Sequence, residues 1–152
     1  MAAPIVSWYN ALNDTQQTSW DIGTVDAGSL SPDTQFLIWN NRGGTEAVSD
    51  MTNCTITTKD PTGGDTGELV TERWVEVKVD ELAEEVFTPI GGLTTKEIGN
   101  GVTPGVIRGT ANDGGKETAN ENNCLVTVHA NVPAVATAGN YAFLLRVSYQ
   151  YV

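Results

Sequence analysis

Apolar and polar residues alternate over the last twelve positions of the chain, residues 141–152. The odd positions all carry large apolar or aromatic side chains, whereas the even ones include an arginine, a serine and a glutamine. Because successive side chains of a β-strand point to opposite faces, this period of two predicts one long core strand with a single buried face. Residues 124–132 alternate in the same way, and residues 133–140 between the two are mostly small. We therefore predict an antiparallel hairpin at the centre of a β-sandwich.

Shorter strand patterns fill much of the remaining chain. Residues 36–39 are apolar without a break, which is typical of a strand buried on both faces. Residues 73–79 alternate cleanly and predict a strand with one face in water. Further strands are expected at residues 4–9 and 20–25, and at 47–52 and 54–59 as two short strands or one bulged strand. The pattern predicts a single all-β, antiparallel sandwich of about seven to nine strands.

Two stretches depart from the strand pattern. Residues 80–87 are the only stretch that resembles a helix, with Leu82, Val86 and Phe87 on one face, and they allow at most about two turns. Residues 91–122 carry eight glycines in thirty-two positions. Loops of that length in a compact domain are usually functional or disordered, so we expect one long glycine-rich surface excursion there.

Length and charge narrow the class of protein. The 152 residues are most simply one domain, 1–152, with a possible N-terminal arm at 1–18. Nineteen acidic and eight basic residues give a net charge of −11, which opposes binding to nucleic acid or to an anionic membrane. The apolar runs fall far short of the roughly 20 residues that cross a bilayer, and the first residues lack the basic and apolar regions of a secretion signal. We expect synthesis in a cytoplasm.

Few residues offer catalytic chemistry. The single histidine, His129, lies in a predicted strand on the face opposite Val126 and Val128, which favours a surface or partly covered strand residue over a general base. The sequence has no Gly-x-Ser-x-Gly, His-x-x-x-His or Cys-x-x-Cys motif, so we predict no catalytic residue and no cofactor. Cys54 and Cys124 are expected to be two small buried thiols, with a disulfide across the sandwich as the alternative.

Acidic loops and aromatic residues raise two binding alternatives. Residues 60–68 and 112–121 supply several of the oxygen ligands that calcium prefers, but neither has the EF-hand spacing, so we favour flexible acidic loops and predict no metal site. The tryptophans could mark a carbohydrate-stacking surface. However, Trp20, Trp39 and Trp74 all fall in predicted strands, where core packing is the simpler account.

A family resemblance adds a functional expectation. Residues 20–29 and 36–41 resemble the opening of Ig-like domains of the ASH or PapD-like kind, with an apolar residue, a glycine, a valine two positions on, a second glycine, and a strand that ends in an Asn-rich turn. Residues 132–143 resemble the final hairpin of such domains, in which an Ala/Gly-rich bend enters the last strand. With its acidic, Thr-, Asn- and Gly-rich body, the chain is similar to virion proteins of tailed bacteriophages that infect Gram-positive bacteria.

This resemblance implies a non-enzymatic structural protein of the virion, made in the host cytoplasm. Such a protein binds a larger assembly as a capsid decoration, neck or tail component, and its partners are other virion proteins (capsid, portal or neck, or tail) and copies of itself. One alternative is a cell-surface adhesion or carbohydrate-binding module. Another is a cytoplasmic ASH-type scaffold.

Partner contacts are expected from the two least regular segments, residues 2–17 and 91–122. Their apolar residues have too few neighbours in sequence to build a core of their own, and Trp8 is the best candidate for an anchor between subunits. For residues 4–9, pairing within the same domain is favoured over addition to a neighbouring sheet. The expected contact residues are Ile5, Trp8, Tyr9, Val102, Val106 and Ile107.

Overall fold

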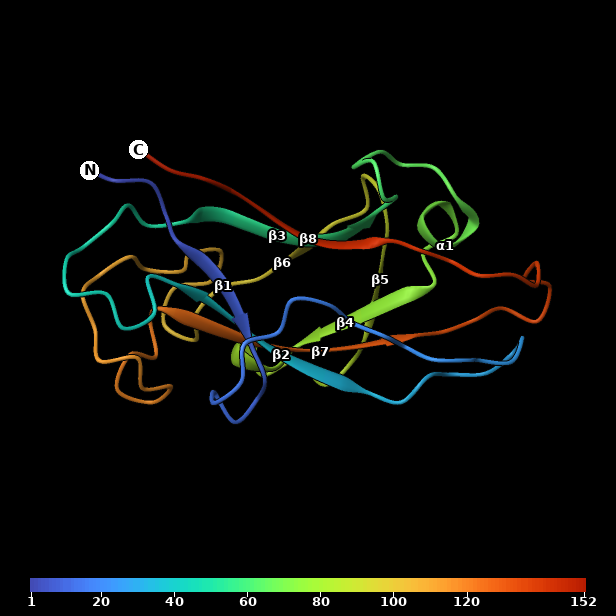
Figure 1. Cartoon of the computed structure of the whole chain (residues 1–152), viewed down its shortest axis with the longest axis horizontal. Coiled ribbons are helices and arrows are strands. Elements are labelled where there is room, and N and C mark those ends of the chain that lie inside the picture. The colour runs from blue at the N-terminus through green and yellow to red at the C-terminus, as the bar shows by residue number, and fades with distance from the viewer.

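The computed structural model describes residues 1–152 and consists of two facing antiparallel β-sheets (Figure 1). The five-stranded sheet has the order β1-β2-β7-β4-β5, and the three-stranded sheet has the order β6-β3-β8. The predicted all-β antiparallel sandwich is therefore confirmed. The two helical segments are single turns, and neither has the length and apolar character that a membrane crossing requires. The elements are β1 (Val6–Tyr9), β2 (Thr34–Asn40), β3 (Thr52–Lys59), α1 (Glu68–Thr71), β4 (Val75–Val79), the 3₁₀ helix η1 (Asp80–Leu82), β5 (Thr88–Ile90), β6 (Lys96–Glu97), β7 (Asn123–Ala130) and β8 (Leu144–Gln150).

The strands follow the order of an immunoglobulin-like sandwich, in which strands A, B, E and D form one sheet and C, F and G form the other. Here β1-β2-β7-β4 matches A-B-E-D, and the antiparallel pair of β3 and β8 matches C and F. A contact known as the tyrosine corner supports this match, because the Tyr141 hydroxyl, just before β8, shares its one proton between the Thr137 carbonyl a few residues upstream and the Glu68 carboxylate. No strand takes the place of G beside β8.

The inner faces of the two sheets enclose one main core of 19 buried residues. In β4, Val75, Val77 and Val79 are fully buried at alternate positions, whereas the charged residues between them are partly exposed. This strand has the pattern that its sequence predicts. The two stretches at 47–52 and 54–59 contribute a single strand, β3, whose register shifts near its start, as in a bulged strand.

The strand β2 is buried on both faces, as its unbroken apolar run predicts. Phe36 and Ile38 belong to the main core, whereas Leu37 and Trp39 form a second small cluster with Ala119 on the other face of the sheet. All four side chains of this run are at most 4% exposed. Ala119, in the 91–122 segment, thus covers part of the outer face of the five-stranded sheet.

The predicted central hairpin is wrong. Strands β7 and β8 lie in different sheets, and residues 131–143 cross from one sheet to the other (Figure 1). Each strand has an apolar face. Two strands in facing sheets bury these faces against each other, whereas two neighbours in one sheet both point them the same way and do not cover each other. The predicted twelve-residue core strand is also shorter, because β8 spans seven residues at the edge of its sheet.

The predicted helix at residues 80–87 is reduced to the single turn η1. Ala83 ends this turn in the left-handed conformation, with φ of 57°. The Glu84 carboxylate then accepts a hydrogen bond of 2.9 Å from the Val79 amide, which folds the chain back on the end of β4. The expected strand at residues 20–25 is also absent, since this stretch pairs with no other strand and Gly23 within it has a φ of 79°.

Candidate partner-binding surface

A shallow groove of about 510 Å³ lies between β1 and the start of β8. One wall contains Val6 and Trp8 of β1, and the other contains Phe143, Leu144 and Leu145 at the start of β8. None of its twelve lining residues is charged, although the chain has a net charge of −11. The groove is therefore an uncharged surface on a strongly acidic protein.

Aromatic rings give this groove a fixed shape. The Phe36 ring meets Trp8 edge-on with 5.7 Å between ring centroids, and it meets Trp20 at 6.1 Å. Trp20 in turn meets Phe143 edge-on at 5.7 Å. Such edge-to-face contacts favour particular ring orientations, and the four rings come from four different parts of the chain. The lining is therefore preformed, as expected of a binding surface that changes little when it is occupied.

The strand β8 has one unpaired edge next to this groove. It pairs with β3, and no backbone hydrogen bond joins it to any segment on its other side. Residues 18–26, which we call the strap, join neither sheet, and residues 18–20 line the groove. Trp20, Ile22 and Val25 of the strap pack on the core, yet none of its amides donates a backbone hydrogen bond. Side chains rather than main-chain pairing hold the strap in place.

The N-terminal contact residues lie in or beside β1. This strand pairs antiparallel with β2 along its length, so the prediction that residues 4–9 pair within their own domain is confirmed. Trp8 lines the groove, whereas the ring of Tyr9 lies under the Arg42 guanidinium, 3.9 Å from its ring centroid. Ile5 remains 57% exposed. Of these three residues, Ile5 is therefore the one that is exposed, whereas Trp8 and Tyr9 are both partly buried.

The structure corrects the expected surface excursion at residues 91–122. Ile107 is fully buried in the main core, and it exchanges two backbone hydrogen bonds of 2.9 and 3.0 Å with Met51. Val106 is half-buried, and only Val102, at 63% exposure, extends its side chain into solvent. Ile107 is thus a core residue, and its side chain is not available for a partner contact.

Glycine in this segment serves close packing. A Cβ atom at Gly109 would lie 2.3 Å from the carbonyl oxygen of Val48, and one at Gly99 would lie 2.3 Å from the amide nitrogen of Gly105. No side chain tolerates such distances, so these positions need a residue without Cβ. The glycines that indicated a loose loop instead let the segment lie directly against neighbouring backbone.

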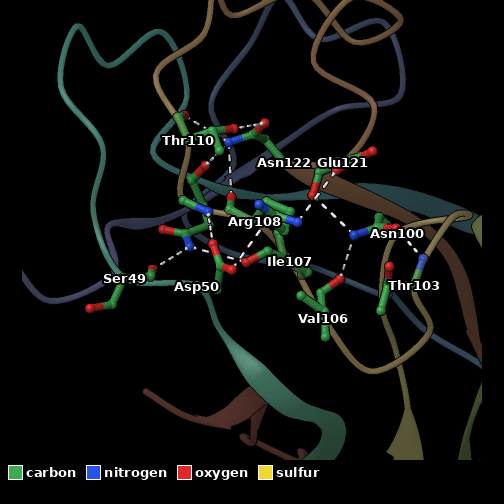
Figure 2. A network of polar contacts seen from close by, with 12 residues as sticks. Ser49, Asp50, Asn100, Thr103, Val106, Ile107, Arg108, Thr110, Glu121 and Asn122 are labelled. Carbon is green, nitrogen blue, oxygen red and sulfur yellow. Dashed lines mark hydrogen bonds and ion pairs between the residues drawn. The ribbon is translucent and has the colours of Figure 1, made fainter. Parts of the chain in front are cut away.

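Asparagine side chains fasten the same segment (Figure 2). The Asn122 side-chain amide donates to the carbonyl oxygens of Arg108 at 2.9 Å and Thr110 at 3.0 Å. The Asn100 amide donates to the carbonyl oxygens of Val106 at 2.9 Å and of the residue before Asn122 at 3.2 Å. Both asparagines are at most 3% exposed. These side chains supply the hydrogen bonds that an irregular, partly buried backbone cannot obtain from a sheet.

Arg108 adds an ionic contact to this network. Its Nε lies 3.2 Å from Asp50 Oδ2, and its Nη1 lies 3.9 Å from Glu121 Oε2, as Figure 2 shows. The side chains are between 38% and 44% exposed, so solvent screens the attraction. The network therefore fixes the segment mainly through its buried amides and forms no concentrated charged site.

His129 is buried under an aromatic ring rather than lying at the surface. Its imidazole is stacked on Phe87 with 3.9 Å between centroids, and the residue is 5% exposed. Nδ1 lies 2.9 Å from Asp33 Oδ1, and Nε2 lies 2.8 Å from Glu76 Oε1. The ring donates to both carboxylates only when both nitrogens carry protons. This cluster ties β4 and β7 to the segment before β2, and Phe87 blocks access to the ring.

The two cysteines are free and fully buried, which confirms the favoured interpretation of two separate thiols. Burial raises the pKa of the Cys54 thiol from 9.0 to about 11, and it also raises the pKa of Cys124. A buried thiol with a raised pKa has little thiolate and is a poor nucleophile. These residues act as small core side chains.

In the acidic loop at residues 60–67, hydrogen-bond donors of the loop itself bind the Asp60 carboxylate. The two Asp60 carboxylate oxygens accept hydrogen bonds from backbone and hydroxyl groups of Thr62, Gly64 and Thr66. Nowhere in the chain do three or more histidine, cysteine or acidic side chains gather as a group that could hold a metal ion.

Comparison with models of protein families and with curated proteins gives no match for this chain.

Proposed function

We propose that the protein is a non-enzymatic structural protein of a bacteriophage virion that binds a larger assembly as a capsid decoration, neck or tail component. The observation that carries this proposal is the uncharged aromatic groove beside the unpaired edge of β8. A net charge of −11 keeps free subunits apart and in solution. A free strand edge next to an apolar groove provides a contact for a partner. A subunit that is synthesised as a free protein and later joins an assembly needs both solubility and a contact surface.

Particles from a host that carries this gene test the proposal. Virions are purified through a density gradient, and quantitative mass spectrometry should find the protein at a constant ratio to the major capsid protein across the particle peak. Particles from a strain with the gene deleted provide the control. A protein that stays in the soluble fraction of the lysate and is missing from the particle peak would overturn the virion role.

A glycan array with a calorimetric calcium titration separates this role from the adhesion or carbohydrate-binding alternative. Trp39 and Trp74 are buried, and Trp8 and Trp20 pack edge-on against Phe36, so the tryptophans form no flat row of exposed rings for sugar stacking. We expect neither glycans nor calcium to bind. A saturable response to either would favour the alternative.

A further inference from the structure

We infer that the free edge of β8 accepts an extended strand from a partner polypeptide, which completes the smaller sheet at the position that strand G takes in immunoglobulin-like sandwiches. The inference names the partner chemistry of the assembly contact proposed above and rests on that proposal. Three features of the molecule support it: the contrast among the four sheet edges, the groove beside β8, and the distribution of charge.

Three of the four sheet edges are protected. The edge strand β6 has only two residues, and both are charged. The edge strand β5 has three residues, including Pro89, which cannot donate a backbone hydrogen bond. At β1, Tyr9 forms a bridge with Gln16, and the next amide, Gln17, donates to the Trp8 carbonyl. Short length, charge, proline and covering chain are the usual means by which proteins block strand addition.

The fourth edge, at β8, has none of these protections. The strand is seven residues long, about 23 Å, contains no proline, and carries one charged residue, Arg146. Alternate residues of an edge strand direct their N–H and C=O groups away from the paired neighbour. The edge therefore offers a row of main-chain donors and acceptors that is long enough to pair with another strand.

The lining of the groove determines which kind of side chain the incoming strand needs at its inward positions. Leu144 and Leu145 belong both to β8 and to the groove wall, so a strand paired with β8 lies over the groove. Alternate side chains of that strand point inward, toward Trp8 and Phe36. Because seven of the twelve lining residues are hydrophobic and none is charged, those inward positions favour apolar residues.

The net charge of this protein indicates whether the strand comes from a second copy or from a different protein. A second copy of this chain would bring a further net charge of −11 to the contact, which opposes self-association. Asp21, which directly follows Trp20 of the groove lining, is exposed. An occupant with apolar residues at alternate positions and lysine or arginine at its ends complements both the groove and its surroundings. The partner is therefore a segment of a different protein with basic flanks.

A synthetic peptide tests strand addition in solution. The probe has about eleven residues: valine and threonine alternate over about seven positions, which is within the usual length of a strand, and a pair of lysines stands at each end. The control peptide has the same composition but groups its valines, which removes the period of two. Binding is followed by tryptophan fluorescence, because Trp8 and Trp20 line the groove, and by amide hydrogen exchange. We expect saturable binding of the alternating peptide, with slower exchange confined mainly to β8 and the strap.

Two matched variants locate the binding surface. Leu144→Lys places a charge in the groove at a position that is 40% exposed, and Val135→Lys places the same charge at an 87% exposed position outside it. We expect the first to weaken peptide binding about tenfold or more and the second to leave it unchanged. If circular dichroism shows that Leu144→Lys is unfolded, Ser7→Lys on the opposite wall replaces it.

Three results would overturn the inference: no slowing of exchange in β8, equal binding of the grouped control peptide, or dimerisation of the free protein through β8. The outcomes are distinct from those of the virion experiment. Incorporation into particles without peptide binding at β8 refutes strand addition and leaves the assembly role. Peptide binding at β8 by a protein that is missing from particles refutes the virion role.

Discussion

Replacement of Ile107 by alanine distinguishes a packed 91–122 segment from a surface excursion. The substitution removes three carbon groups from a side chain with no exposed surface. At about 0.8 kcal/mol for each group, the lost transfer free energy is about 2.4 kcal/mol. The cavity left behind adds to this cost, and measured substitutions of this kind lie at about 2–5 kcal/mol. We expect a loss of roughly 3–4 kcal/mol, against a total stability of about 5–15 kcal/mol for a domain.

Urea unfolding, followed by tryptophan fluorescence and circular dichroism, measures this loss. With a urea dependence of about 2 kcal/mol per molar, the midpoint should fall by about 1.5–2 M. The matched control is Val102→Ala in the same segment, whose side chain is 63% exposed and whose replacement should change stability by less than about 0.5 kcal/mol. A midpoint for Ile107→Ala equal to that of Val102→Ala would refute the packed arrangement.

Three further predictions concern the thiols, the asparagine network and a carboxylate. With a pKa of about 11 for Cys54, its thiolate fraction at pH 8 is about a hundredfold below that of a thiol at 9.0, so Ellman's reagent should react with neither cysteine until the protein is unfolded. Asn122→Ala removes donors to two carbonyl groups and should cost about 1–3 kcal/mol of unfolding free energy, whereas the same change at exposed Asn120 should have little effect. The hydrogen bond from the Tyr141 hydroxyl lowers the pKa of Glu68 below 4.5. The stabilising effect of the ionised Glu68 is therefore present above pH 4.5 and is lost as pH falls through the folded pKa. In carboxyl NMR titrations, Tyr141→Phe should raise the pKa of Glu68.

The sequence predicts strands and buried faces well because burial on one side leaves a period of two. Residues 73–79 and 36–39 show this, since their patterns match one-sided burial in β4 and two-sided burial in β2. Periodicity does not reveal which strands are neighbours. Strands β7 and β8 both have an apolar face, and this is equally compatible with a hairpin and with two facing sheets. Their separation depends on the long-range pairing of β7 with β2 and β4.

The 91–122 segment shows why composition misleads. Glycine and asparagine are the usual residues of loops, because glycine adopts many conformations and asparagine competes for local hydrogen bonds. Gly99 and Gly109 instead provide close backbone approach, and Asn100 and Asn122 provide buried hydrogen bonds. Both roles depend on neighbours far away in the chain. The one local signal was Ile107, an apolar residue next to a valine in an otherwise polar tract.

The strongest strand pattern in the sequence lies in an edge strand whose core-facing side chains are only partly covered. Apolar side chains at Leu145, Val147 and Tyr149 face the core but remain half-buried, and Tyr151 is 52% exposed. Each 40 Å² of apolar surface left in water forgoes about 1 kcal/mol of burial free energy. A run with this many large apolar residues is more apolar than an edge strand requires. A strand added along β8 and across the groove would cover this surface and pair the free main-chain groups in the same step.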